Sequence, residues 1–150
     1  MVTAFVAISQ SYWFRIRYFC RYDYQNNTDS VLVRDVDEAK AYYVDVLGFF
    51  LVNDLTFGKD WRYVTVAPDE TNETVIELVK AETEVQRSLV GKQSGGQVLL
   101  MFQTDDIEAD YAAMKKRGVR FSGKPQAVPG GRGVGFVDCY GNNFDVFQPD

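Results

Sequence analysis

The sequence predicts an α+β domain made of two tandem βαβββ modules. Two segments have the apolar spacing of amphipathic helices, a strand-like segment precedes each of them, and an apolar segment follows each directly after a glycine. The order strand, helix, three strands occurs twice, with a spacing of about 70 residues between equivalent positions. We therefore expect one module at about residues 28–81 and a second at about residues 97–149.

The first helix is predicted over residues 35–47. Asp35 can cap its N-terminus, with Glu38 three residues later as in a capping box, and apolar residues recur at helical spacing along one face. Gly48 ends the helix where a left-handed residue is favourable. The strands expected around this helix are residues 30–33, 48–54, 62–67 and 75–81.

The second helix is predicted over residues 106–117, with Asp105 as its cap and Gly118 after its end. Its last turn carries three basic residues, which suit the negative end of the helix dipole. The strands expected here are residues 97–104, 118–123, 133–137 and 144–148, and the polar joint between the modules contains a possible short helix at 85–90.

Residues 1–27 do not fit the repeat. They hold many aromatic side chains among three arginines. They could form an extra strand or an ordered arm, or a loosely held N-terminal extension. We expect the extension, followed by one domain over residues 28–150.

The composition excludes several function classes. The net charge of −5 disfavours nucleic acid and suits a cationic small molecule, although mild acidity also simply keeps a protein soluble. The sequence has no His, which excludes His-based triads and the commonest metal ligand. Two distant cysteines without a CxxC pattern predict a reduced, cytoplasmic protein, and no apolar run is long enough to predict a membrane span.

Four segments in a particular order carry a resemblance to a known family. They are VLVRDVDEAKAYYVDVLGF at 31–49, VIELV at 75–79, GGQVLLMFQTDDI at 95–107 followed by MKKRGVRF, and DCYGNNFDVFQP at 138–149. Over about residues 28–149 the chain resembles the vicinal oxygen chelate superfamily, which includes glyoxalase I, the bleomycin-resistance proteins and the extradiol dioxygenases.

The resemblance implies that the two modules form a curled mixed sheet around a shared cleft. In metal-using members, four strands each direct one side chain into that cleft. The corresponding positions here are Thr28, Glu77, Asp145 and either Leu99 or Gln97. Two positions that usually hold His lack it, so we expect no metal and no cofactor.

Strand alternation identifies further polar and aromatic candidates. Glu77 and Asp145 interrupt apolar strands, so each is either a cleft carboxylate or a charge on a solvated strand face. Their missing partner would be water, a distant arginine such as Arg62 or Arg132, or a cationic ligand. The complete set of expected ligand-binding residues is Thr28, Trp61, Glu77, Gln97, Leu99, Phe102, Arg132, Phe136, Asp145 and Phe147, with the four aromatic residues either a pocket wall or ordinary core.

We therefore expect a protein of the glyoxalase/bleomycin-resistance type that binds a small molecule, possibly a cationic antibiotic or metabolite, without the usual metal. The alternative is a metal-independent or atypical lyase or isomerase that uses Glu77 or Asp145 as a general base. We further expect a homodimer, because the aromatic content of 15% suggests a buried apolar patch.

Overall fold

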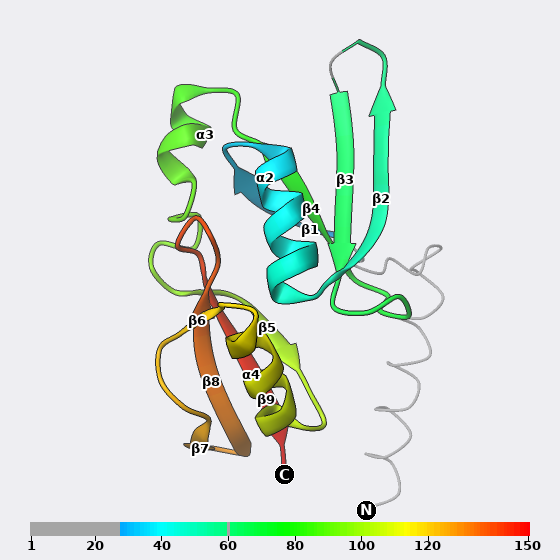
Figure 1. Cartoon of the computed structure of the whole chain (residues 1–150). Coiled ribbons are helices and arrows are strands. Elements are labelled where there is room, and N and C mark those ends of the chain that lie inside the picture. The colour runs from blue at the N-terminus through cyan, green and yellow to red at the C-terminus, as the bar shows by residue number, and fades with distance from the viewer. Residues whose placement is uncertain (1–27, 60) are drawn as a thin grey trace, which may run out of the picture.

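The computed structural model describes residues 28–59 and 61–150 (Figure 1). The expected extension, residues 1–27, lies outside the described residues. In the described part of the chain, no helix is long and apolar enough to cross a membrane.

The first module forms a four-stranded mixed sheet, here called sheet A. Its strand order is β1-β4-β3-β2, with β1 parallel to β4 and the other neighbours antiparallel. Its elements are β1 (Thr28–Val33), α2 (Val36–Ala41), the π-helix η1 (Tyr42–Leu47), β2 (Phe50–Phe57), β3 (Trp61–Ala67) and β4 (Val75–Lys80).

The second module follows the short helix α3 (Glu84–Leu89) and forms a five-stranded sheet, here called sheet B. Its path is β5-β9-β8-β6, and β7 also pairs with β8. Its elements are β5 (Val98–Gln103), α4 (Ile107–Lys116), β6 (Arg120–Phe121), β7 (Gln126–Val128), β8 (Gly131–Val137) and β9 (Asn143–Pro149). The predicted fold class and the tandem order of elements are confirmed; β7 was not predicted.

The helix ends show why the sequence forms helices at these places. The Asp35 carboxylate accepts hydrogen bonds from the backbone N–H groups of Asp37 and Glu38, both at 2.9 Å. In the second module the cap is Asp106 and not Asp105, because the Asp106 carboxylate accepts from the N–H of Ala109. The predicted first helix is one continuous helical segment, but its second half is wound as the π-helix η1.

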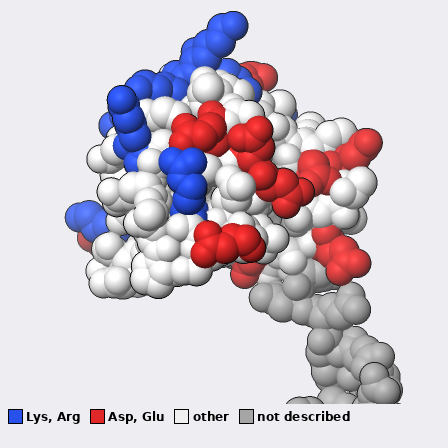
Figure 2. Space-filling view, turned by 90° about the horizontal axis from the view of Figure 1, so that it is seen from below, with Lys and Arg blue, Asp and Glu red and all other residues white. Residues whose placement is uncertain are grey.

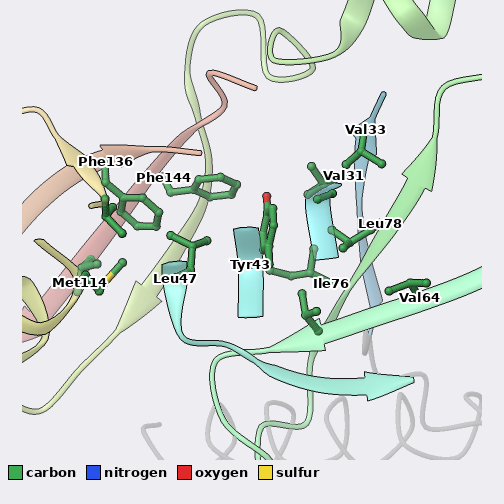
Figure 3. Packing of buried hydrophobic residues seen from close by; sticks show 14 of the residues in the cluster. Val31, Val33, Tyr43, Leu47, Val64, Ile76, Leu78, Met114, Phe136 and Phe144 are labelled. Carbon is green, nitrogen blue, oxygen red and sulfur yellow. The ribbon is translucent and has the colours of Figure 1, made fainter. Parts of the chain in front are cut away.

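One hydrophobic core serves both modules. Sheet A contributes residues such as Val31, Ile76 and Leu78, and sheet B contributes Phe136 and Phe144. The segment α2–η1 lies between the two groups and buries Tyr43 and Leu47 (Figure 3). Each sheet thus turns one face to the shared core, and its other face points away from that core.

Candidate functional site

Glu77 lies on the face of sheet A that points away from the core. Its neighbours in β4, Ile76 and Leu78, are buried, whereas Glu77 is half-buried on the opposite side of the strand. The strand register places Glu77 beside Ser30 in β1 and Thr65 in β3. The Thr65 hydroxyl in turn accepts a 2.9 Å hydrogen bond from the side-chain amide of Asn53.

Aromatic side chains continue this face toward the tip of the β2–β3 hairpin. Trp61 pairs with Phe57 across the hairpin, and their ring centroids are 4.9 Å apart. Tyr63, two residues further along β3, lies 6.3 Å from the Trp61 ring. The side chain of Trp61 is 60% exposed and that of Phe57 45% exposed, so the two rings offer an open stacking surface.

A pocket opens where β3 separates from β4. The two strands are registered only at Thr65–Glu77 and Val66–Ile76, and β3 then continues toward the hairpin tip paired with β2. The space between them is a pocket of about 540 Å³. It is lined by Asp35, Val36, Asp37, Trp61, Arg62, Glu77, Val79, Lys80, Glu82 and Gln86.

Asp145 occupies the corresponding face of sheet B. It lies between Met101 of β5 and Gly135 of β8, and its own neighbours Phe144 and Val146 are buried. Phe147 follows on the same face, opposite another glycine of β8. Glycines of β8 stand opposite both residues, and a pocket of about 460 Å³ lies beside them. Gln97 lines a smaller pocket of about 270 Å³ that also touches Asp145.

Glu77 lines the pocket of about 540 Å³, whereas Asp145 lines the pockets of about 460 and 270 Å³. A single cleft that holds both carboxylates stays a prediction. Sheets A and B pack their apolar faces on one shared core. Glu77 and Asp145 each lie on the face of their own sheet that is opposite the buried core residues.

The other expected site residues divide between strand faces and core. Thr28 pairs with Val75 and lies on the Glu77 face of sheet A, two positions along β1 from Ser30. Leu99 is half-buried and packs against the core, next to an irregularity in the β5–β9 pairing.

Two of the aromatic candidates point toward the core. Phe136 is 2% exposed, and its ring stacks on those of Phe102 and Phe144 at centroid distances of 6.2 and 5.4 Å. Trp61 and Phe147 therefore remain on the strand faces that carry the carboxylates, whereas the rings of Phe102 and Phe136 belong to the packing between the modules.

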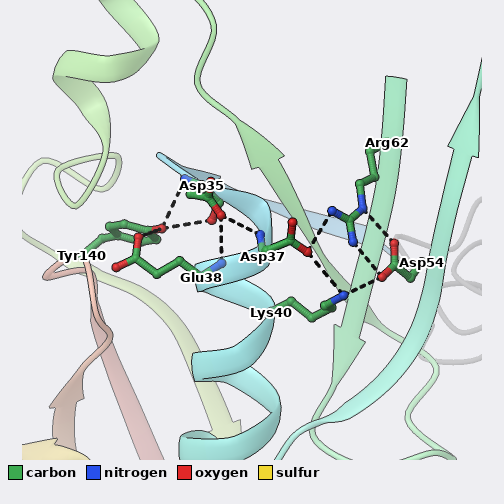
Figure 4. Close-up of polar contacts among 7 residues, drawn as sticks. All are labelled: Asp35, Asp37, Glu38, Lys40, Asp54, Arg62 and Tyr140. Carbon is green, nitrogen blue, oxygen red and sulfur yellow. Dashed lines mark hydrogen bonds and ion pairs between the residues drawn. The ribbon is translucent and has the colours of Figure 1, made fainter. Parts of the chain in front are cut away.

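Neither candidate arginine reaches the two carboxylates. Arg132 forms an ion pair with Glu108 at 2.6 Å. Arg62 is held by two other carboxylates, those of Asp54 and Asp37 (Figure 4). Among the described residues, no hydrogen bond or ion pair joins the side-chain carboxylate of Glu77 or Asp145 to a protein group.

The ion pairs around Arg62 form one network, which we call the hairpin clamp: Asp37, Lys40, Asp54 and Arg62. The guanidinium binds both carboxylate oxygens of Asp54 at 2.9 Å and reaches Asp37 at 2.9 Å, and Lys40 binds Asp54 at 2.7 Å. Hydrogen bonds from Arg62 and Lys40 hold the pKa of Asp54 far below its ordinary value, and that from Arg62 lowers the pKa of Asp37.

The donors at the family's metal positions do not suit a transition metal. The chain has no His, and Thr28 and Leu99 offer no imidazole or carboxylate. No group of three or more Cys, Asp or Glu residues in the described part of the chain is arranged to hold a metal ion. Two carboxylates on different sheets are a poor ligand set even for a hard cation.

Charged side chains are unevenly distributed over the surface. On the face seen in Figure 2, acidic side chains gather in a band across the middle, whereas most Lys and Arg side chains lie toward one margin. The net charge of −5 has the same sign.

Several residues of this site were missed by sequence reasoning. Asn53, Tyr63 and Thr65 complete the Glu77 face, and Met101 lies beside Asp145. One signal was present in the sequence: the alternating glycines of GGRGVG at 130–135 indicate a strand with one face free of side chains. The others depend on which strands become neighbours, which no local pattern specifies.

Comparison with known proteins agrees with this fold. An uncharacterised protein of Shewanella frigidimarina (strain NCIMB 400) is 37% identical over 120 residues, which is 79% of this chain and 89% of the relative. The crystal structure of TnmS3, an antibiotic binding protein from Streptomyces sp. CB03234, is 33% identical with a TM-score of 0.71, covering 85% of this chain and 98% of TnmS3.

The crystal structure of UcmS2 superimposes with a TM-score of 0.74 at 29% identity, covering 84% of this chain and 98% of that one. The family model described as Glyoxalase/Bleomycin resistance protein/Dioxygenase superfamily matches residues 25–146. The match spans both modules and includes Glu77 and Asp145. The resemblance found in the four sequence segments is thereby confirmed, and the chain belongs to the glyoxalase/bleomycin resistance protein/dioxygenase superfamily.

Proposed function

We propose that this protein binds a planar, cationic small molecule, an antibiotic or metabolite, without a metal ion. The observation that carries the proposal is Glu77, a half-buried carboxylate without a protein partner, in a pocket that Trp61 also lines. A carboxylate removed from water gains most from a positively charged partner. An open aromatic pair beside it adds stacking and cation–π attraction.

The relatives support a binding role. TnmS3 is described as an antibiotic binding protein and matches nearly its whole length to this chain. The absence of His removes the ligands on which metal-dependent members of the superfamily rely. What this chain offers instead is shape, stacking surface and negative charge, which suffice to bind a molecule.

We further propose that two copies complete the binding cleft. Glu77 lies one strand inside the β1 end of sheet A, and Asp145 lies one strand inside the β5 end of sheet B. If β1 of one copy lies beside β5 of another, both carboxylates face one continuous surface. A two-fold axis then generates two equivalent clefts.

The test is a titration calorimetry experiment with proflavine, a planar cation, and with anthracene-9-carboxylate as a planar anion. Proflavine should bind and the anion should bind much more weakly. Glu77→Gln should weaken proflavine binding about tenfold, which corresponds to about 1.4 kcal/mol. Trp61→Ala should weaken both compounds, because it removes stacking surface but no charge.

Glu73→Gln is the matched control, since Glu73 is an exposed carboxylate outside the pocket. Equal affinities of wild type, Glu77→Gln and Glu73→Gln for proflavine would refute the role of Glu77. Chromatography of the ligand after incubation supplies a second readout, because a converted ligand would favour a lyase or isomerase over a binding protein.

A further inference from the structure

The outer half of the β2–β3 hairpin stands away from the rest of sheet A. Beyond the Thr65–Glu77 pair, β3 keeps its register with β2 as far as Phe57–Trp61 but has no further registered pair with β4. Figure 1 shows this ribbon projecting past the end of β4. A two-stranded ribbon is only marginally stable by itself, so other contacts must fix its position.

The hairpin clamp supplies such contacts. Arg62 and Asp54 belong to the hairpin, whereas Asp37 and Lys40 belong to α2. Arg62 binds Asp37 at 2.9 Å and Asp54 binds Lys40 at 2.7 Å, so two ion pairs cross from the ribbon to the helix (Figure 4). Among the described residues, Asp54 and Arg62 make all the ion pairs of hairpin residues 54–63.

The clamp and the stacking surface are on opposite sides of the same strand. Arg62 and Trp61 are consecutive residues of β3, so their side chains project to opposite faces. Arg62 faces α2, and Trp61 faces the side that carries Glu77. Any shift of the ribbon relative to α2 therefore moves the Trp61 ring relative to the Glu77 carboxylate, which is fixed in β4.

We propose that Arg62 is a positioning residue, and that the hairpin clamp sets the width of the binding pocket by holding the aromatic hairpin at a fixed distance from β4. Arg62 and Asp37 also line the pocket, so their positional role has to be measured without a ligand. The clamp keeps Trp61 and Glu77 at a fixed separation before a ligand binds. This lowers the entropy cost of ordering the hairpin during binding. The affinity part of this inference rests on the proposed function; the positional part does not.

The positional part is tested without ligand, by hydrogen exchange of the full-length protein. In Arg62→Gln, the amides of residues 55–63 should exchange several-fold faster, with unchanged exchange in β8 and β9. The double variant Asp37→Asn/Lys40→Gln keeps the Arg62–Asp54 pair inside the hairpin but removes both links to α2. It should show the same acceleration, and sodium chloride at 0.5 M should reproduce part of it because salt screens exposed pairs.

Lys80→Gln is the control, because Lys80 lines the same pocket but makes no ion pair with a described residue. Its hairpin exchange should equal that of wild type. Normal hairpin exchange in the double variant would overturn the proposal, since Arg62 would then only join β2 to β3.

Proflavine affinity gives the second readout. We expect the double variant to bind proflavine several-fold more weakly than wild type, although Trp61 and Glu77 are unchanged in it. If proflavine does not bind wild type, the proposed function fails while the exchange result still decides the role of the clamp. If proflavine binds wild type and the double variant equally, the hairpin position does not control the pocket and the proposal is refuted.

Discussion

Asp138 is the residue on which the closing turn of sheet B depends. It is fully buried and accepts hydrogen bonds from the Tyr43 hydroxyl, from two backbone N–H groups and from the Asn142 side chain, at 2.8 to 3.0 Å. In the sequence, this residue is the Asp of the DCYGN segment. In the structure, it joins the turn of the second module to the helix of the first. The buried carboxylate accepts four hydrogen bonds, and removing one of the donors lowers the stability of the fold.

Tyr43→Phe should lower the free energy of unfolding by about 1–2 kcal/mol at pH 7, because it deletes one hydrogen bond to Asp138. The pKa of Tyr43 is raised well above its ordinary value of 10.0 by burial and by the neighbouring Asp138. The stability that this hydroxyl contributes is therefore fully present below pH 10 and is lost as the pH rises further.

Urea unfolding at pH 7, 9 and 11 measures both effects. The difference between wild type and Tyr43→Phe should narrow between pH 9 and 11. Tyr63→Phe serves as the control, since no described residue hydrogen-bonds to its hydroxyl. A difference that stays constant up to pH 11 would contradict the assignment of Tyr43 as a buried, protonated donor.

At the scale of elements, the π-helix η1 ends on a contact from the second module. Arg117, at the end of α4, donates hydrogen bonds to the carbonyls of Val46 and Leu47 at 2.8 and 2.9 Å. The last carbonyls of a helix lack partners within the helix, and a cation there also complements its dipole. Gly48 follows with φ of 83°, and a side chain at this position would collide with the Arg117 guanidinium.

Arg117→Ala should destabilise the protein by about 1 kcal/mol, because two carbonyls lose their donor and regain only water. Arg117→Lys should recover less than half of this, since lysine keeps the charge but lacks the planar fork that bonds two carbonyls. Thermal unfolding measures the loss. Lys116→Ala, an exposed neighbour in the same helix, should change stability by less than about 0.5 kcal/mol. Equal effects at positions 116 and 117 would count against the contact.

Elements were more predictable than their arrangement. The cap at Asp35, the glycine at 48 and the alternating strands are local signals, and the structure has them where the sequence places them. The π-winding of η1 and the strand β7 depend on contacts with other elements. The candidate site divided in the same way: alternation placed Glu77 and Asp145 opposite their buried neighbours, but it could not show that the two sheets share one core or which pockets the two residues line.

At the scale of the whole molecule, each sheet ends in a strand whose outer edge pairs with no other strand among the described residues. β1 ends sheet A and β5 ends sheet B, and the β1 edge is partly covered because the Gln93 side chain donates to the Ser30 carbonyl and accepts from the Leu32 N–H. Val98 and Met101 on β5 are 44% and 61% exposed. Exposed apolar side chains beside an unpaired strand edge favour burial by a partner protein. A contact between copies made through side chains would not compete with Gln93 for the backbone groups of β1.

We therefore expect a homodimer that buries the β5 end of sheet B. Light scattering at micromolar concentration should give about 34 kDa, twice the chain mass of 17.1 kDa. Met101→Glu should shift the protein toward the monomer, because it would bury an unpaired charge. Val85→Lys, at a residue of α3 that is 70% exposed, should leave the mass unchanged. A monomeric wild type would exclude the shared cleft.

Mixing two binding-deficient variants distinguishes a shared cleft from two independent ones. If each cleft combines Glu77 of one copy with Asp145 of the other, a Glu77→Gln/Asp145→Asn heterodimer has one doubly altered cleft and one intact cleft. Random exchange of equal amounts makes half of the dimers mixed, so about a quarter of all clefts should regain wild-type affinity for proflavine. If each cleft instead lies within one chain, every cleft in the mixture keeps one substitution. Recovery is then absent, and the fluorescence titration of the mixture equals the average of the two separate variants.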